Sequence, residues 1–242
     1  MSEQKRSVSI WLTSALEKEF GPYAGVDEVG LGCFAGPIFA AAVIITNYDW
    51  PEVDQLGDSK TMGPRRRQAL SKRIKEECRW AIGRSEVSEI DTLGLRHAHA
   101  LAIQRAVEAL AAQVPVPAVI IDGDAFDIDL GDLPVRFIRY GDSLIPSVAA
   151  ASIVAKVDRD AHMTELHEEY PEYGWNENAA YGTPAHMAAM YKHGLTPHHR
   201  RSFKPVGRVA HELGDCCDGL QPACCFMHGL REKKGNHRAS SR

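Results

Sequence analysis

Long apolar runs are missing from the 242-residue sequence. Near its start, the apolar stretch 34–45 is twelve residues long, whereas a membrane-spanning helix needs about 20. Charged residues also interrupt the first twenty positions, where a signal peptide would carry an apolar segment. These absences argue against a membrane protein and lead us to expect a cytoplasmic one.

A strong net charge is missing as well. The 28 Lys and Arg residues nearly balance 32 Asp and Glu residues, for a net charge of −4, so the overall balance does not indicate a nucleic-acid partner. Two local stretches do: 60–75 holds seven basic residues and 191–208 holds five, with no acidic residue in either. One such run usually marks a solvated helix face, but two in a small protein favour a polyanionic partner.

Cysteine is scarce in the body of the chain. Cys33 and Cys78 stand alone, and the other four cysteines crowd into 216–225. Their adjacent pairs lack the two-residue spacing of common zinc sites, and 209–242 shows no lasting helical or strand periodicity. We therefore expect reduced thiols and a flexible Cys/His-rich tail, with a zinc site as the less favoured alternative.

Apolar runs and turn residues predict strands that alternate with helices. Strands are expected at 23–29, 38–46, 79–87, 118–122 and 135–140, and helices at 8–20, 64–78, 146–170 and 184–193. Apolar residues at three- and four-residue steps from Leu95 predict one more helix, which ends before Pro115. The first two strands would form a hairpin. This order predicts an α/β fold, a mixed sheet with helices packed on it.

Four carboxylates fall beside glycines at the ends of predicted strands: Asp27, Glu28, Asp122 and Asp142. Functional groups of α/β sheets gather at strand ends, and carboxylates brought together raise one another's pKa unless a cation joins them. Each acid alone is equally well explained as a turn residue. The four together predict a site for Mg²⁺ or Mn²⁺, which prefer oxygen ligands. Two such ions can hold the attacking and leaving oxygens of a phosphodiester.

The segments around these acids resemble the ribonuclease HII family, the type 2 ribonucleases H. The resemblance covers about 20–208, and its blocks stand in the family's order: 23–30, 36–37, 58–60, 121–123, 141–143, 149–157, 159–160, 181–183 and 198–203. It implies a ribonuclease-H-like fold, a mixed sheet flanked by helices with a helical C-terminal segment. The domain prediction is then a helical extension over 1–20, a catalytic domain over 21–208 and the tail over 209–242.

The resemblance also implies an activity. It predicts a metal-dependent endonuclease that cleaves the RNA strand of RNA–DNA hybrids and cuts duplex DNA on the 5′ side of embedded ribonucleotides. The products would carry 3′-hydroxyl and 5′-phosphate ends. Asp27, Glu28, Asp122 and Asp142 would be the catalytic residues and would hold Mg²⁺ or Mn²⁺. We expect a monomer without a membrane partner.

Further residues are implied as contacts to the substrate. The family's Gly-Arg-Gly turn, which reads the ribose 2′-hydroxyl largely with its main chain, is Gly30-Leu31-Gly32 here. Leucine lacks the guanidinium that would hold a phosphate. Tyr181 matches a tyrosine that packs on the sugar next to the ribonucleotide. The candidates for contacts to backbone phosphates are Ser59, Lys60, Ser152 and Lys156, although Lys156 could instead pair with the acids.

Two departures from the family leave alternatives open. Leu31 and the segment Asn178-Ala179-Ala180 differ from the family's pattern, which would suit a non-catalytic hybrid-binding protein. The complete set of four acids argues against that alternative. A DNA-processing nuclease of the same fold is the other, and the 2′-hydroxyl-reading turn and Tyr181 argue against it. The segment 198–201 fits phosphate contact and internal packing equally well, and Asp158 and Asp160 fit surface ion pairs with Arg159 or a nearby lysine.

Overall fold

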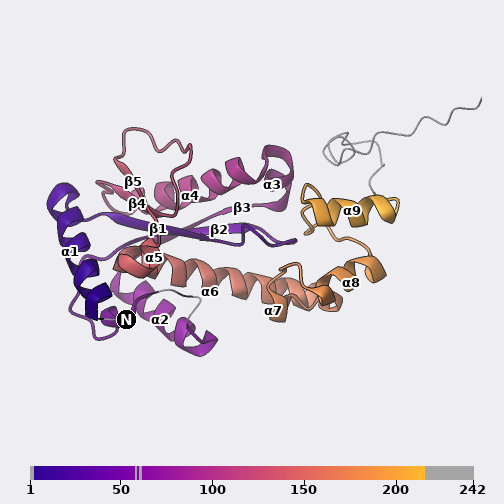
Figure 1. The fold of residues 1–242 in the computed structure, drawn as a ribbon, viewed down its shortest axis with the longest axis horizontal. Helices are drawn as coiled ribbons and strands as arrows, with labels where there is room; N and C mark the ends of the chain where they lie inside the picture. Colours follow the sequence, from indigo (N-terminus) through magenta and orange to yellow (C-terminus); the bar gives the residue numbers. More distant parts are fainter. Residues whose placement is uncertain (1–2, 58, 60–61, 216–242) are drawn as a thin grey trace, which may run out of the picture.

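A five-stranded mixed sheet lies at the centre of the computed structural model, which describes residues 3–57, 59 and 62–215 (Figure 1). The strands are β1 Ala24–Val29, β2 Ile38–Ile44, β3 Arg79–Ser85, β4 Val119–Asp122 and β5 Val135–Ile138, in the order β3-β2-β1-β4-β5. The first three pair antiparallel, whereas β4 and β5 extend the sheet in parallel with β1. The predicted hairpin and mixed sheet are therefore confirmed.

Helices cover both faces of this sheet (Figure 1). They are α1 Glu3–Phe20, α2 Pro64–Glu77, α3 Val87–Leu93, α4 Leu95–Ala111, α5 Gly141–Leu144, α6 Pro146–Glu169, α7 Trp175–Asn178, α8 Pro184–His193 and α9 Lys204–Glu212, with the short 3₁₀ turns Val53–Gln55 and Pro171–Tyr173. The helices α3 and α4 lie on one face, α6 and α2 lie on the other, and α7 to α9 extend beyond one end of the sheet. Within the described residues, no helix is long and apolar enough to cross a membrane.

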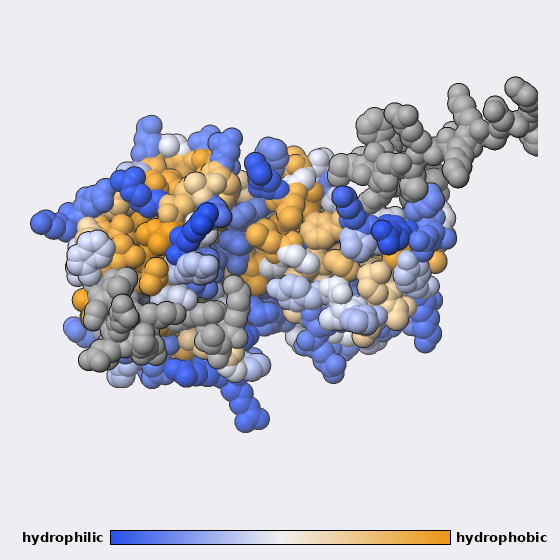
Figure 2. Space-filling view, viewed as in Figure 1, coloured by the Kyte–Doolittle hydropathy of each residue, from blue (hydrophilic) through white to orange (hydrophobic). Residues whose placement is uncertain are grey.

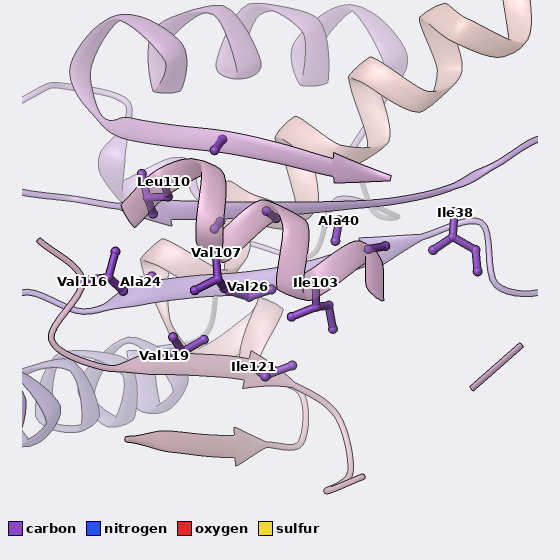
Figure 3. Close-up of a cluster of buried hydrophobic side chains, with 14 of the residues drawn as sticks. Ala24, Val26, Ile38, Ala40, Ile103, Val107, Leu110, Val116, Val119 and Ile121 are labelled. Atoms are coloured by element: carbon purple, nitrogen blue, oxygen red, sulfur yellow. The ribbon is translucent and has the colours of Figure 1, made fainter. Parts of the chain in front are cut away.

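The period of two along a strand divides its side chains between the two layers. On the α4 side, Val26 of β1 and Ala40 of β2 pack with Ile103, Val107 and Leu110, all of them buried (Figure 3). On the other side, small residues of α6 lie directly against the strands. A Cβ at Gly25 would lie 2.3 Å from the carbonyl carbon of Ser147, so the close approach of α6 to β1 requires a glycine there.

The C-terminal end of the described chain departs from the sequence expectation. The helix α9 crosses residue 208, where a flexible tail was expected to begin, and continues to Glu212. Val209 and Ala210 are buried, and this burial explains why the helix extends beyond the predicted boundary. The tail cysteines lie outside the described residues.

On the face in Figure 2, hydrophilic and apolar residues are mixed, as on most globular surfaces.

Candidate active site

Three of the four predicted carboxylates meet at one edge of the sheet. Asp27, Asp122 and Asp142 each offer a carboxylate oxygen, and these three atoms all lie within 4.8 Å of one another; we call them the acidic cluster. The parallel register pairs Val26 with Ile121, so the next residues of the two strands, Asp27 and Asp122, are neighbours. The Gly141 N–H donates to Asp122 Oδ1 at 2.6 Å, which fixes the start of α5 and hence Asp142.

The acidic cluster carries an electrostatic cost. Asp27 and Asp142 are buried and Asp122 is half-buried. Burial, followed by the charges of Glu28 and Asp122, raises the pKa of Asp27 well above its ordinary value, although a hydrogen bond from Ser152 opposes the shift. Burial and the charge of Asp142 likewise raise the pKa of Asp122. A cation held by these oxygens would remove the repulsion, so the donor set fits a divalent ion such as Mg²⁺ or Mn²⁺.

Glu28 points to the opposite face of β1. Neighbouring side chains on a strand alternate, and Glu28 Oε2 lies 3.1 Å from His99 Nε2 of α4. The group of three ligand atoms does not include it, but its charge still acts on Asp27. The structure therefore brings together three of the four proposed ligands and holds the fourth beside them with a histidine that the sequence analysis did not single out.

Two buried arginines shape the segment that contains Gly30-Leu31-Gly32. Arg159 of α6 donates to the carbonyl of Pro37 at 3.1 Å and to that of Ala35 at 3.2 Å. Arg200 donates to the carbonyl of Gly36 at 2.8 Å and to that of Leu31 at 3.1 Å. The Leu31 side chain packs partly buried against the core on the α4 side. Sequence reasoning missed this role of the arginines because their acceptors are carbonyls more than a hundred positions away.

The structure bears on the alternatives left open for 198–201 and for Asp158 and Asp160. His199 and Arg200 are fully buried, so this part of 198–201 packs internally. Asp158 pairs with Lys75 at 2.5 Å, and Asp160 pairs with Lys156 at 2.6 Å. The expectation of surface ion pairs is confirmed for the lysine alternative.

The candidate phosphate contacts occupy different environments. Ser59 Oγ and Ser152 Oγ lie 2.9 Å apart and both residues are buried, with Ser152 next to Asp27. Lys156, paired with Asp160 rather than with the acidic cluster, lines a cavity of about 410 Å³ together with Arg67. Lys60 lies outside the described residues. Tyr181 stands in the loop before α8, where 44% of it is exposed.

A mixed five-stranded sheet flanked by helices, with Asp27 of β1, Asp122 at the end of β4 and Asp142 of α5 brought together, is a ribonuclease-H-like architecture with a candidate metal site. Residues 24–206 match the family model described as "Ribonuclease HII". The chain belongs to the ribonuclease HII family, so the resemblance seen in the sequence is confirmed, and the protein is an endoribonuclease.

Curated relatives agree over most of the chain. A ribonuclease HII from Paracoccus denitrificans is 47% identical over 186 residues, covering 77% of this chain and 86% of the relative. One from Sphingopyxis alaskensis is 43% identical over 201 residues, covering 83% of this chain and 96% of the relative.

Solved structures share the fold at lower identity. The ribonuclease H2 from Pyrococcus horikoshii has a TM-score of 0.68 and 22% identity, covering 80% of this chain and 99% of that one. Bst-RNase HIII, solved in complex with Mn²⁺, has a TM-score of 0.66 and 19% identity, covering 83% of this chain and 73% of that one. These structures confirm the ribonuclease-H-like architecture.

Proposed function

We propose that this protein hydrolyses the RNA strand of RNA–DNA hybrids and cuts duplex DNA on the 5′ side of embedded ribonucleotides, leaving 3′-hydroxyl and 5′-phosphate ends. The observation that carries the proposal is the acidic cluster, whose three ligand atoms lie within 4.8 Å of one another. A protein that only binds hybrids gains nothing from three repelling carboxylates, so the cluster supports catalysis over the binding alternative. We propose that the protein acts as a monomer in the cytoplasm.

The proposed ligands of Mg²⁺ or Mn²⁺ are Asp27, Asp122 and Asp142, with Glu28 as the fourth carboxylate. When bound, two such ions would activate water and stabilise the charge on the departing 3′ oxygen. The chain's own contribution is to hold the carboxylates in place before the metal arrives. The Glu28 N–H donates to Asp27 Oδ1 at 2.8 Å, and the Ser152 hydroxyl bonds to the same carboxylate. We therefore propose that Ser152 orients Asp27.

Recognition of the ribose would come from the main chain of Gly30-Leu31-Gly32. The Leu31 side chain packs partly buried against the core, which supports a readout by backbone groups. Tyr181 would pack its exposed ring on the neighbouring sugar. Lys60 and Lys156 remain proposed phosphate contacts. Ser59 and Ser152 remain candidates as well, although their mutual hydrogen bond and burial favour support of the acidic cluster.

Three duplexes test the proposal: DNA with one ribonucleotide, a continuous RNA–DNA hybrid, and all-DNA. Each is incubated with Mg²⁺, with Mn²⁺ or with EDTA, and extension of the product by a DNA polymerase reports a free 3′-hydroxyl. We expect metal-dependent cutting of the first two duplexes alone. Binding without cutting would favour the non-catalytic alternative, and cutting of all-DNA would favour the DNA nuclease. Asp27→Asn removes one charge from the cluster and should abolish this cutting, and Asp132→Asn, which changes an exposed acid, is its matched control.

A further inference from the structure

Three consecutive carbonyls that end at Tyr181 are each held by a different donor. Arg159 Nη1 donates to the Ala179 carbonyl at 3.0 Å, and the Phe34 N–H donates to the Ala180 carbonyl at 2.8 Å. His186 Nδ1 lies 3.0 Å from the Tyr181 carbonyl. Because a carbonyl only accepts, this partner assigns the His186 proton to Nδ1. Tyr181 is 44% exposed as a residue, so its backbone is fixed at a position that solvent reaches.

The fixed backbone adopts conformations that L-residues seldom take. Ala179 has φ +47° and Ala180 has φ +63°, both in the left-handed region. A Cβ at Gly182 would lie 2.2 Å from the Phe34 ring, so the chain on the other side of Tyr181 is packed too closely for a larger residue. Such conformations persist only where the surroundings over-determine them, and they cluster at ligand contacts.

Behind His186 lies a buried chain of hydrogen bonds. Trp175 Nε1 donates to His186 Nε2 at 3.1 Å, and His199 Nε2 lies 3.2 Å from the same nitrogen. The Thr196 N–H donates to His199 Nδ1 at 3.0 Å, so the His199 proton is on Nε2, and the Trp175 and His199 N–H groups share the single lone pair of His186 Nε2. Burial holds both imidazoles neutral, because it lowers the pKa of His199 to about 3 and lowers that of His186 as well. The bonds thus run from the Thr196 amide to the Tyr181 carbonyl.

The same buried residues also hold the segment around Gly30-Leu31-Gly32. Arg159, which binds the Ala179 carbonyl, also donates to Ala35. Arg200 directly follows His199 and donates to the Leu31 carbonyl at 3.1 Å. Tyr181 and the turn are therefore tied to one buried framework, although they are about 150 positions apart in the sequence.

We propose that the His186–His199 pair is a positioning element that sets Tyr181 at a fixed place relative to Gly30-Leu31-Gly32, and so sets the preference for a ribonucleotide–DNA junction over a continuous hybrid. This inference rests on the proposed function, because it assigns the sugar contact to Tyr181. A pair with only a packing role would instead affect both substrates equally.

The test is a double-mutant cycle between His186 and Tyr181. The variants are His186→Leu, Tyr181→Ala, their combination, and His186→Asn, whose side-chain amide can replace the Nδ1 donor. The readout is the ratio of kcat/KM on the single-ribonucleotide duplex to kcat/KM on the hybrid, with thermal melting as the check on folding. We expect His186→Leu and Tyr181→Ala each to lower this ratio about tenfold, with no further loss in the combination. His186→Asn should recover most of the ratio, and Tyr191→Ala, an exposed tyrosine on α8, should leave it unchanged.

Equal loss on both substrates, or a full additional loss from His186→Leu in the Tyr181→Ala background, would overturn the proposal. If His186→Leu does not fold, His199→Asn replaces it, because the amide oxygen can still accept from the Thr196 N–H while the donor to His186 is lost. The ratio of dissociation constants for the two duplexes, measured in EDTA, gives an independent readout. A wild-type protein that prefers the junction in EDTA but does not cut it would refute the proposed function alone. A wild-type protein without that preference would refute the positioning role.

Discussion

Asp27 carries a charge that a purely structural role would not require. It is buried, it adjoins Glu28 and Asp122, and these three effects raise its pKa well above the ordinary range. A folded-state pKa above the unfolded value means that ionised Asp27 destabilises the metal-free protein at neutral pH, and that the penalty shrinks as the pH falls. The metal-free protein is therefore less stable at neutral pH than it would be with an uncharged residue in place of Asp27.

Asp27→Asn should separate stability from activity. Asparagine keeps the shape and the acceptor for the Glu28 N–H but removes the charge, so in EDTA at pH 7 we expect the melting temperature to rise by a few degrees. Cleavage at saturating Mn²⁺ should fall by at least about 100-fold. The gain in melting temperature should narrow towards pH 5. An active variant, or one that is less stable than wild type in EDTA, would contradict the assignment.

Leu31 permits a test of how the turn meets phosphate. Leu31→Arg adds a cation beside the proposed substrate, so we expect tighter binding and a salt dependence of log K steeper by about 1. The lost packing of Leu31 against the core should lower the melting temperature slightly. Leu31→Met keeps an apolar side chain without charge and should change neither binding nor slope. Binding titrations at four salt concentrations measure this salt dependence. An unchanged slope of log K for Leu31→Arg would place the side chain away from the duplex.

At the scale of elements, the helix α6 connects the fold to the site. It begins at Pro146, lies against β1 and β2, and carries Ser152 beside Asp27 and Arg159 beneath the 30–37 segment. Periodicity and turn residues predicted this helix and all five strands. The side on which each acid lies was less well predicted. The alternation along a strand indicates that the consecutive Asp27 and Glu28 face opposite ways, a signal that the grouping of four acids overlooked.

Other features had no usable signal in the sequence. Asp142 was expected just after a strand and lies instead in the short helix α5. The start of this helix is held by the hydrogen bond from the Gly141 N–H to Asp122, which forms only after folding. The roles of Arg159 and His186 depend on backbone carbonyls brought close by the tertiary structure. Such contacts cannot be found from local pattern, since neither partner is chemically distinctive along the chain.

Gly25→Ala tests the contact between α6 and β1. The added Cβ would meet the backbone of Ser147 and Val148 at 2.3 Å, where no flexible side chain can move aside. We expect a loss of about 1–3 kcal/mol in the free energy of unfolding and reduced cleavage, since Ser152 would shift from Asp27. Gly57→Ala, where a Cβ would meet nothing within 4 Å, is the control. Wild-type stability in Gly25→Ala, measured by urea denaturation, would contradict the close packing.

At the scale of the whole molecule, the buried histidines link stability to pH. The pKa of His199 falls to about 3 in the folded state, below its value near 6.5 in an unfolded chain. The unfolded state therefore binds more protons between these values, and stability is lost as the pH falls below about 6.5, by about 1.4 kcal/mol per pH unit for one such group.

Urea denaturation at pH 7, 6 and 5 checks this loss. His199→Asn should be less stable than wild type at pH 7 and should lose less stability on acidification. The exposed His193→Asn should follow the wild-type curve. Because the acidic cluster acts with the opposite sign, the comparison between variant and wild type isolates His199, and parallel curves for the two proteins would refute the linkage.

The folded part of the chain extends beyond the family match, through α9. The described chain continues through α9 to Glu212, with Val209 buried and Asp215 paired with Arg201 at 2.8 Å. Every proposed site residue, and the family match over 24–206, precedes this point. A chain that ends at Asp215 should therefore keep the wild-type melting temperature and the cleavage of an embedded ribonucleotide. Like the full-length protein, it should bind no stoichiometric zinc.

A chain that ends at Arg208 divides α9 and removes Val209, whose burial contributes roughly 1.5–3 kcal/mol, so its melting temperature should fall by several degrees. One zinc per full-length chain that is absent after truncation at Asp215 would instead support a metal site in the Cys/His-rich segment.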